Sequence, residues 1–477
     1  MPNKAAISPP NPIGHNMSTP RTRNLRQGSI PGHFRALAVP AAIGMVFSTL
    51  YNVVDLWYAG LLGTDAQAGL AITFQVFMLL IAFGVGLGSA MSALVGNALG
   101  EDDTAGAKQI ATQGLVFGLL TALALGVSGI WGSPALLALV SEPGAYRDAA
   151  NAYMNVILLA TAPFLLAFGG NGILTAQGDT DSMKRAQIAA FFANLGLNPL
   201  FIFGVPGLIA GIGFNGIALA TLVSQTGVMA YILWRVMQSE VMDGARSWRP
   251  DPVRAREIAA QALPSTFAMM ILLVAGFFVQ MFLKSFGPEA LAAYGIGLRI
   301  EQLILLPGFG LTGALLPIVA QNFGAGQHDR VRDAWWFCLK VGTGVMLVGS
   351  ALLWFAAAPM VALFNDDPNV IRLGTDYLHV DGFILPLYLA LFAVNAMLQA
   401  FKRPMATVWI GIWRQGIAVG LFCWLYVTVF DWGTWGVWFG IATAVISGLA
   451  LSLWVLEHIA RTKIGGLLAT SQRLPAA

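Results

Sequence analysis

The chain has 477 residues, of which 57% are hydrophobic and only 10% are charged, whereas soluble domains carry about 25% charged residues. This composition excludes a soluble globular protein, and the length allows many apolar segments of about 20 residues, the span of a transmembrane helix. The net charge is only +3, and no basic face lies outside the loops between apolar segments, so nucleic acid is excluded as a partner.

The apolar segments predict an all-α integral membrane protein with twelve transmembrane helices. The links between these helices are short, which leaves no room for a soluble catalytic domain. The predicted spans cover residues 34–61, 68–98, 108–131, 146–169, 184–205, 211–237, 256–284, 291–323, 330–357, 374–400, 404–430 and 434–460.

Three segments outside the spans complete the predicted organisation. Residues 1–33 are rich in Pro, Asn, Ser and Arg and lack the apolar run of a signal peptide, so we expect a disordered cytoplasmic tail there. Residues 238–255 are basic and form the predicted cytoplasmic linker between an N-lobe at 34–237 and a C-lobe at 256–460. Residues 461–477 are predicted to be a second cytoplasmic tail.

The two halves of the chain are related by a shift of 224 residues. Repeated Pro and Gly positions carry weight because these residues fix where helices start, bend and stop. The matched positions include Pro40 and Pro264, Gly84 and Gly308, Gly86 and Gly310, and Gly100 and Gly324. Six spans per half is an even number, so the repeat is predicted to be parallel, with two six-helix lobes of the kind that enclose a transport path.

The distribution of positive charge predicts the orientation in the membrane. Lys and Arg concentrate in alternate loops, whereas the opposite loops contain only Arg147, Lys284 and Arg372. Cytoplasmic loops carry the excess of Lys and Arg in membrane proteins. Both termini are therefore predicted to be cytoplasmic.

Asp55 is an ionisable residue inside the first predicted span, and its presence there requires an explanation. An ionisable group at the helix centre costs about 2.5–3.5 kcal/mol on insertion scales. One interpretation is a carboxylate that reaches the outer headgroups, although Asp is too short to snorkel as Lys and Arg do. The other is a functional site, which Asn52 could join because it lies one helical turn away.

The fifth and sixth spans supply possible partners for Asp55. Asn194 and Asn198 are four residues apart on one helix face, and Pro199 follows them and frees a backbone carbonyl. Together with Thr221, these residues could form an oxygen-rich cage for a proton or a small hard cation such as Na⁺. Ordinary interhelical hydrogen bonding is the alternative, and spacing alone favours it.

The second half contributes further ionisable residues at membrane depth. Arg299 and Glu301 lie in span eight on different helix faces, and Arg414 lies in span eleven. Two interpretations stay open: Glu301 and Arg414 pair structurally, or the arginines line the central cavity and favour anionic groups. The candidate cavity residues are Asn52, Gln75, Arg299, Glu301, Asn395 and Arg414.

Other reactive residue types do not form a site in the sequence. The clusters Glu101–Asp103 and Asp366–Asp367 fall in predicted loops without His or Cys nearby, so solvated loop charge is the expected role. Cys338 and Cys423 are predicted to be buried apolar fillers. There is no GxxxxGK[ST] motif and no nucleophile–base arrangement, so we expect neither an enzyme nor an organic cofactor.

These motifs together resemble one family. The run Tyr51–Gly60 is similar to the first span of MATE (multidrug and toxic compound extrusion) transporters. The glycine-rich runs Gly84–Gly88 and Gly96–Gly100 resemble the family's second span and following turn, and the run Asn194–Gly204 resembles its fifth span. The second half repeats the pattern in Gln321–Gly326, and the resemblance covers residues 34–460.

The resemblance implies a two-lobe antiporter of the bacterial inner membrane that expels cationic, amphipathic drugs in exchange for Na⁺ or H⁺. It implies an ion-coupling role for Asp55 and N-lobe site positions for Asn194 and Thr221. Asn198 departs from a branch that has Asp there. Leu272 and Asn395 stand near the positions where another branch of the family has acidic C-lobe residues, and their absence favours an N-lobe site.

A second functional hypothesis is a flippase or exporter of a lipid-linked or anionic metabolite, and Arg299 and Arg414 would support it. The expected partners are small-molecule drugs or metabolites and membrane lipids, and the protein is expected to be a monomer. The coupling ion, H⁺ or Na⁺, is the only bound ion that the resemblance implies.

Overall fold

The computed structural model describes residues 23–140, 143–205, 207 and 209–468, most of which lie in helices. In the N-terminal half the α-helices are α1 (Ile30–Leu62), α2 (Thr64–Gly100), α3 (Thr104–Val140), α4 (Ala145–Leu159), α5 (Thr161–Ala176), α6 (Asp181–Phe203) and α7 (Asn215–Met237). In the C-terminal half they are α8 (Pro252–Leu283), α9 (Pro288–Gly324), α10 (His328–Ala362), α11 (Pro368–Ala400), α12 (Met405–Gly411), α13 (Val419–Trp424) and α14 (Gly433–Ile464).

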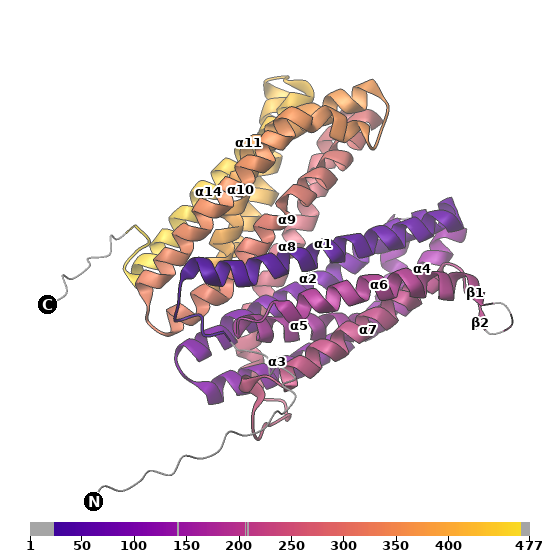
Figure 1. Cartoon of the computed structure of the whole chain (residues 1–477). Coiled ribbons are helices and arrows are strands. Elements are labelled where there is room, and N and C mark those ends of the chain that lie inside the picture. The colour runs from indigo at the N-terminus through magenta and orange to yellow at the C-terminus, as the bar shows by residue number, and fades with distance from the viewer. Residues whose placement is uncertain (1–22, 141–142, 206, 208, 469–477) are drawn as a thin grey trace, which may run out of the picture.

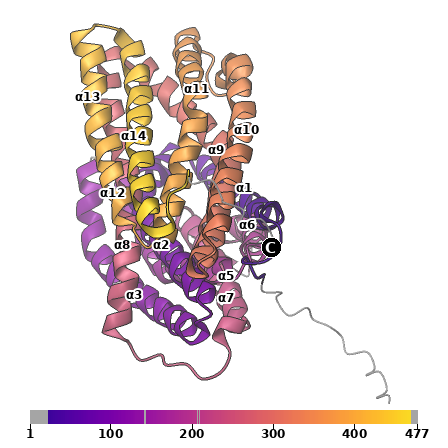
Figure 2. The same ribbon diagram turned by 90° about the vertical axis from the view of Figure 1, so that its left-hand side faces the viewer.

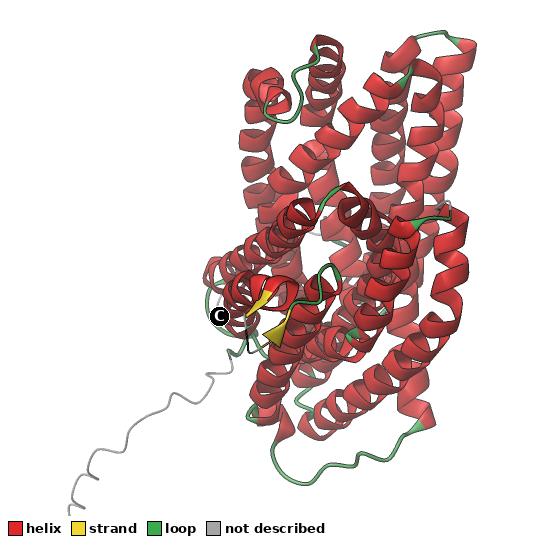
Figure 3. Cartoon of the chain, turned by 90° about the vertical axis from the view of Figure 1, so that its right-hand side faces the viewer, coloured by secondary structure: helices red, strands yellow, loops and turns green. Residues whose placement is uncertain are grey.

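Short irregular pieces connect some of these helices. The π-helical turns Ile412–Ala418 and Leu425–Val429 continue α12 and α13, so that residues 405–429 form one rod. Single 3₁₀ turns occupy Glu240–Met242 and Lys284–Phe286. The two-residue strands β1 (Gly204–Val205) and β2 (Ile209–Ala210) pair antiparallel as a hairpin at the far end of the N-terminal half (Figure 3).

The predicted number of membrane spans is confirmed. Among the described residues, 11 helices are long and apolar enough to cross a membrane. The number becomes 12 when α4 and α5, which are bent by 44° at Ala160, are taken as one broken span. The protein is therefore an all-helical membrane protein.

The helices form two bundles that meet at one end and diverge toward the other (Figure 1). Helices α1–α7 make up the N-lobe, and α8–α14 make up the C-lobe (Figure 2). The first helix of each lobe packs against the second helix of the other lobe, α1 against α9 and α8 against α2. We call the end where the lobes meet the closed end; the described chain begins and finishes there.

The contacts between the lobes obey the shift of 224 residues. A Cβ on Gly86 of α2 would lie 2.7 Å from the carbonyl oxygen of Ala262 in α8. A Cβ on Gly310 of α9 would lie 2.8 Å from the carbonyl oxygen of Ala38 in α1. The positions match pairwise after the shift, so the repeated glycines are the places where helices of different lobes cross at backbone contact.

An apolar cluster at the closed end joins the two lobes. We call it the closed-end core. It contains N-lobe residues such as Phe34 and Ala93 and C-lobe residues such as Leu315, Trp335 and Phe401, all of them buried. Of three further apolar clusters, one lies within the N-lobe, one lies within the C-lobe, and one lies mainly in the N-lobe but includes Ile258 and Ala262 of α8. Hydrophobic burial therefore stabilises each bundle separately and also stabilises the contact between them.

The predicted boundary of the N-terminal tail is wrong. Helix α1 begins at Ile30, before the expected residue 34, and Pro31 suits the first turn because its missing N–H is not needed there. Residues 23–29, expected to belong to a disordered tail, make specific contacts with both lobes. The rest of the predicted tail, residues 1–22, lies outside the described residues.

The linker also ends earlier than expected. Helix α8 starts at Pro252, because Asp251 caps it by accepting hydrogen bonds from the N–H groups of Val253 and Arg254. Within the linker, Met242 is fully buried against the N-lobe core. At the other terminus α14 continues to Ile464, so the predicted tail 461–477 begins as helix.

Candidate functional site

Helices α1, α6 and α7 bring four polar side chains together inside the N-lobe. Asp55 comes from α1 and is only 6% exposed, Asn194 and Asn198 come from α6 and are fully buried, and Thr221 comes from α7. The i,i+4 spacing places both amides on the α6 face that packs against α1. The sequence-predicted cage residues therefore lie together, about 10 Å from the far end of α1 at 1.5 Å per residue.

Three neutral donors hold the carboxylate of Asp55. The Nδ2 atoms of Asn194 and Asn198 donate to its Oδ1 at 3.0 and 2.9 Å, and the hydroxyl of Thr221 donates to its Oδ2 at 3.2 Å. Asn198 also donates to the Oδ1 of Asn194 at 3.0 Å. The Oδ1 of Asn198 itself is buried and has no partner among the described residues, so unused acceptor capacity lies beside the carboxylate.

A second layer of hydroxyl groups supports this arrangement. Tyr51, one turn before Asp55, has its hydroxyl 2.7 Å from that of Ser224, which donates to the carbonyl of Thr221 at 3.2 Å. Asn52, expected on the Asp55 face, is exposed and donates to the carbonyl of Ser48 instead. That prediction is wrong because α6 and α7 pack against the Tyr51 side of α1, and sequence periodicity alone allowed either residue.

The chemistry of this site is that of one buried carboxyl group held by three neutral donors, with an amide oxygen of Asn198 left over as a further acceptor. A buried charge is costly unless it is compensated, and the described ion pairs include none to Asp55. Within the described part of the chain there is also no group of three His, Cys, Asp or Glu residues for a transition metal. A proton or a hard monovalent cation fits the donor set.

The C-lobe contains a second buried polar group, of which the sequence analysis singled out Glu301 but missed Tyr377 and Asp381. Glu301 on α9 accepts a hydrogen bond of 2.5 Å from the hydroxyl of Tyr377 on α11. Asp381, one turn after Tyr377, is 1% exposed, and neither of its carboxylate oxygens has a partner among the described residues. We call Glu301 and Asp381 the C-lobe carboxylate pair; the cost of an ionisable residue inside a span would have identified Asp381.

Arg414 lies near this pair but is not in direct contact with it. It sits on the π-helical turn of the α12–α13 rod, a type of irregularity that is frequent at functional sites. Glu301 attracts it electrostatically, yet the described ion pairs within 4.0 Å do not join the two. Its aliphatic stem packs against Gly448 of α14, and the predicted direct Glu301–Arg414 pair is not formed.

The remaining predicted cavity residues are Arg299, Asn395 and Gln75. Arg299 is exposed, and Asn395 is half-buried on α11; neither forms a side-chain hydrogen bond with a described residue. The side chain of Gln75 on α2 lies outside the described ones. Among the described side chains, Arg299 and Asn395 belong neither to the Asp55 network nor to the C-lobe carboxylate pair.

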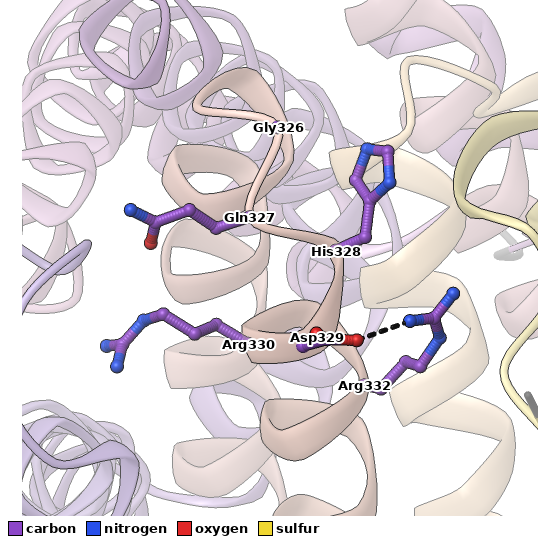
Figure 4. A pocket seen from close by; sticks show the side chains of 6 residues that line it. All are labelled: Gly326, Gln327, His328, Asp329, Arg330 and Arg332. Atoms are coloured by element: carbon purple, nitrogen blue, oxygen red, sulfur yellow. Dashed lines mark hydrogen bonds and ion pairs between the residues drawn. The ribbon is translucent and has the colours of Figure 1, made fainter. Parts of the chain in front are cut away.

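A pocket of about 510 Å³ lies at the closed end, at the turn between α9 and α10 (Figure 4). Its arginines are already engaged: Arg332 pairs with Asp329 at 2.6 Å, and Arg330 donates to Asn322 at 2.8 Å. The pocket therefore offers no free charged group toward Asp55, which lies near the other end of α1. Its lining residues are Gly326, Gln327, His328, Asp329, Arg330 and Arg332.

A duplicated helical membrane protein with carboxylates buried inside its spans has the organisation of a transporter. The model of the MatE family matches residues 40–200 and 264–425, one segment in each lobe. The chain belongs to this family of MATE transporters.

Known relatives agree with the family. The chain is 28% identical to the FAD transporter of Shewanella oneidensis, over 79% of this chain and 84% of the relative. It is 24% identical to the probable multidrug resistance protein YpnP of Bacillus subtilis, over 80% and 87%. A solved outward-facing conformation of a multidrug resistance MATE family transporter has the same fold, with a TM-score of 0.86 at 23% identity over 95% of this chain and all of that one.

Proposed function

We propose that the protein is a secondary active antiporter that exports amphipathic, mostly cationic compounds in exchange for H⁺ or Na⁺ bound at Asp55. The observation that carries the proposal is the burial of Asp55 among three neutral donors without a cationic partner. A proton or a Na⁺ ion compensates this charge, and its release or entry then changes the stability of the packing around α1. Multidrug exporters among the relatives support the substrate class.

Asp55 can couple the ion to transport only if ion and substrate favour different states of the lobes. We propose that the closed end faces the cytoplasm, because the first and last described residues and the predicted basic loops lie there. The structure is then the state open to the outside. An inward-moving charge gains about 2.3 kcal/mol per 100 mV of membrane potential, which drives return of the carrier.

The test is substrate efflux by Asp55→Asn in proteoliposomes with separately imposed pH and Na⁺ gradients. The amide keeps the size of Asp55 but cannot ionise, so the variant should fold and bind substrate while gradient-driven efflux falls at least about 100-fold, or 2.7 kcal/mol. The control is Asn52→Ala, which removes the neighbouring exposed amide and should keep the wild-type rate. Wild-type efflux with unchanged ion dependence in Asp55→Asn would exclude the proposed role.

Export of an anionic metabolite is a second candidate. The relative from Shewanella oneidensis is an FAD transporter, and FAD carries two phosphate groups. Arg299 is exposed without a described hydrogen bond, and Arg414 is half-buried, so both can meet an anionic group. Vesicle uptake of FAD compared with that of a cationic dye separates the candidates, and FAD transport that is lost in Arg299→Gln but not in Arg35→Gln would favour the second.

A further inference from the structure

Residues 23–29 cross from one lobe to the other at the closed end. We call them the N-terminal strap. The strap precedes α1 and so belongs to the N-lobe by chain connection, yet its Leu25 side chain is fully buried in the closed-end core beside C-lobe residues such as Val331 and Trp335. Separation of the lobes at this end would draw Leu25 out of that apolar environment.

The backbone of the strap is also bonded to the C-lobe. The N–H of Leu25 donates to the Oε1 of Gln321 at 3.0 Å, and its carbonyl accepts from Asn322 at 3.1 Å and from Arg330 at 3.2 Å. Arg330 donates to the carbonyl of Gly28 as well, at 2.9 Å. Four hydrogen bonds therefore hold Leu25 and Gly28 to α9 and α10.

Two arginines attach the strap to the N-lobe. The N–H of Arg23 donates to the carbonyl of Gln177 at 3.0 Å, and Arg26 donates to the carbonyl of Gly100 at 3.2 Å. Arg26 also pairs with Asp102 at 2.7 Å. Its guanidinium lowers the pKa of the Asp102 carboxyl below the ordinary value through this hydrogen bond, so the pair stays ionised at neutral pH.

The strap occupies one side of an otherwise symmetric contact. Asn97 of the N-lobe donates to the carbonyl of Ala400 in the C-lobe at 3.0 Å, and Gln321 of the C-lobe donates to the carbonyl of Ala176 in the N-lobe at 2.6 Å. The two bonds match under the shift of 224 residues. The Oδ1 of Asn97 is buried and finds no partner in the described part of the chain, whereas the Oε1 of Gln321 accepts from Leu25.

We propose that the N-terminal strap is a latch that stabilises the closed end, and that Leu25 must leave the C-lobe each time the lobes separate there. The symmetric amide contacts would hold the lobes on both sides of the pseudo-twofold axis, and the strap adds its apolar anchor and four hydrogen bonds on one side only. The contact between the two lobes is therefore stabilised asymmetrically, although the lobes themselves are repeats of each other. This inference does not depend on which substrate or ion is carried.

The experiment measures how often the closed end opens. Ala93 on α2 is fully buried in the closed-end core, so a cysteine there reacts with a membrane-impermeant maleimide only when the lobes separate. Ala93→Cys is introduced into a protein carrying Cys338→Ala and Cys423→Ala, and its reaction rate is measured with the full-length chain in inside-out and in right-side-out vesicles, so that the reagent reaches the closed end whichever side of the membrane that end faces. At low opening probability this rate is proportional to the fraction of open molecules.

Leu25→Ala should raise the rate at least about tenfold, which corresponds to about 1.4 kcal/mol, because truncating a buried leucine destabilises the state that buries it. The matched control is Leu467→Ala. Leu467 lies in the same core, but its backbone hydrogen bonds go to Trp336 and Glu457 of the C-lobe. Its truncation should leave the rate within about twofold of the wild-type value.

A rate for Leu25→Ala equal to that of the parent, or equal increases in both leucine variants, would overturn the latch. Arg330→Gln provides a second variant that leaves the core intact and removes the hydrogen bonds to Leu25 and Gly28; it should also raise the rate. Because the readout is accessibility, it is independent of efflux. The latch can therefore be tested even if the protein shows no transport. The role of Asp55 can likewise be tested even if the strap proves not to be a latch.

Discussion

At the scale of the single residue, Asp55 is a buried carboxylate whose described hydrogen-bond donors are all neutral. Its three hydrogen-bond donors are neutral side chains from two other helices, so they orient the carboxylate without cancelling its charge. A cationic partner in the same place would hold the group permanently ionised. Under the proposed function, the neutral donors leave this charge to be compensated by an exchangeable ion, as a coupling residue requires.

Part of this site could be predicted from the sequence and part could not. Asp55, Asn194, Asn198 and Thr221 were predicted together because polar residues inside spans need partners. The choice of Tyr51 over Asn52 depends on which side of α1 meets its neighbours, and both lie within one turn of Asp55. Tertiary packing decides that question, and helical periodicity does not.

The C-lobe carboxylate pair allows a prediction at the level of one hydroxyl group. Tyr377→Phe removes the buried hydrogen bond to Glu301 and keeps the ring, which packs edge-on against Tyr294 and Trp438. The free energy of unfolding should fall by about 1–3 kcal/mol, because a buried carboxylate loses its donor. Thermal unfolding in detergent measures the effect.

The control for this change is Tyr294→Phe. Tyr294 is buried in the same aromatic cluster, but its hydroxyl forms no hydrogen bond with a residue that the structure describes. Its removal should change the unfolding temperature much less. If the two variants were equally destabilised, the loss would come from general packing and the Tyr377–Glu301 bond would contribute nothing of its own.

At the scale of elements, the repeat was the strongest signal in the sequence, and the structure gives its physical reason. Helices α2 and α9 cross helices of the other lobe at backbone contact, which only glycine permits at Gly86 and Gly310. The strap was missed for the opposite reason. Residues 23–29 have no periodic apolar pattern, and the single Leu25 gains its partners only after α9 and α10 are in place.

The glycine crossings predict a change in the balance between states. Gly310→Ala places a methyl group 2.8 Å from the carbonyl oxygen of Ala38 and 3.1 Å from the backbone nitrogen of Ala42, so the closed end cannot pack as before. The maleimide reaction rate of a cysteine at Ala93 should rise at least about tenfold. By the symmetry of the repeat, Gly86→Ala should have the same effect.

Gly313→Ala is the matched control on the same helix, because nothing lies within 4 Å of the methyl group that it adds. Both changes improve helix propensity by a similar amount. A faster reaction in Gly310→Ala but not in Gly313→Ala therefore reports the contact between lobes. Equal rates in the two variants would mean that the crossing at Gly310 does not limit closure.

At the scale of the whole molecule, the orientation in the membrane is inferred from the distribution of Lys and Arg. The described termini and the linker lie at the closed end, and this end also carries most of the predicted basic loops. The inside excess of Lys and Arg would place the closed end in the cytoplasm. The state described here would then be the one from which substrate leaves the cell.

The last prediction tests this orientation. Thr64 lies at the junction of α1 and α2 at the far end of the N-lobe, and Arg249 lies in the linker at the closed end; both are exposed. With Cys338 and Cys423 replaced by alanine, Thr64→Cys should react with an impermeant maleimide in intact spheroplasts, and Arg249→Cys should react only in inside-out vesicles. Because one helix, α1, has Thr64 beyond one end and the strap at the other, reaction of both cysteines from one side would contradict a membrane-spanning α1. A clean exchange of the two sides would keep the fold and invert the transport cycle, so that the closed end would face outward and the structure would be the state that loads substrate from the cytoplasm.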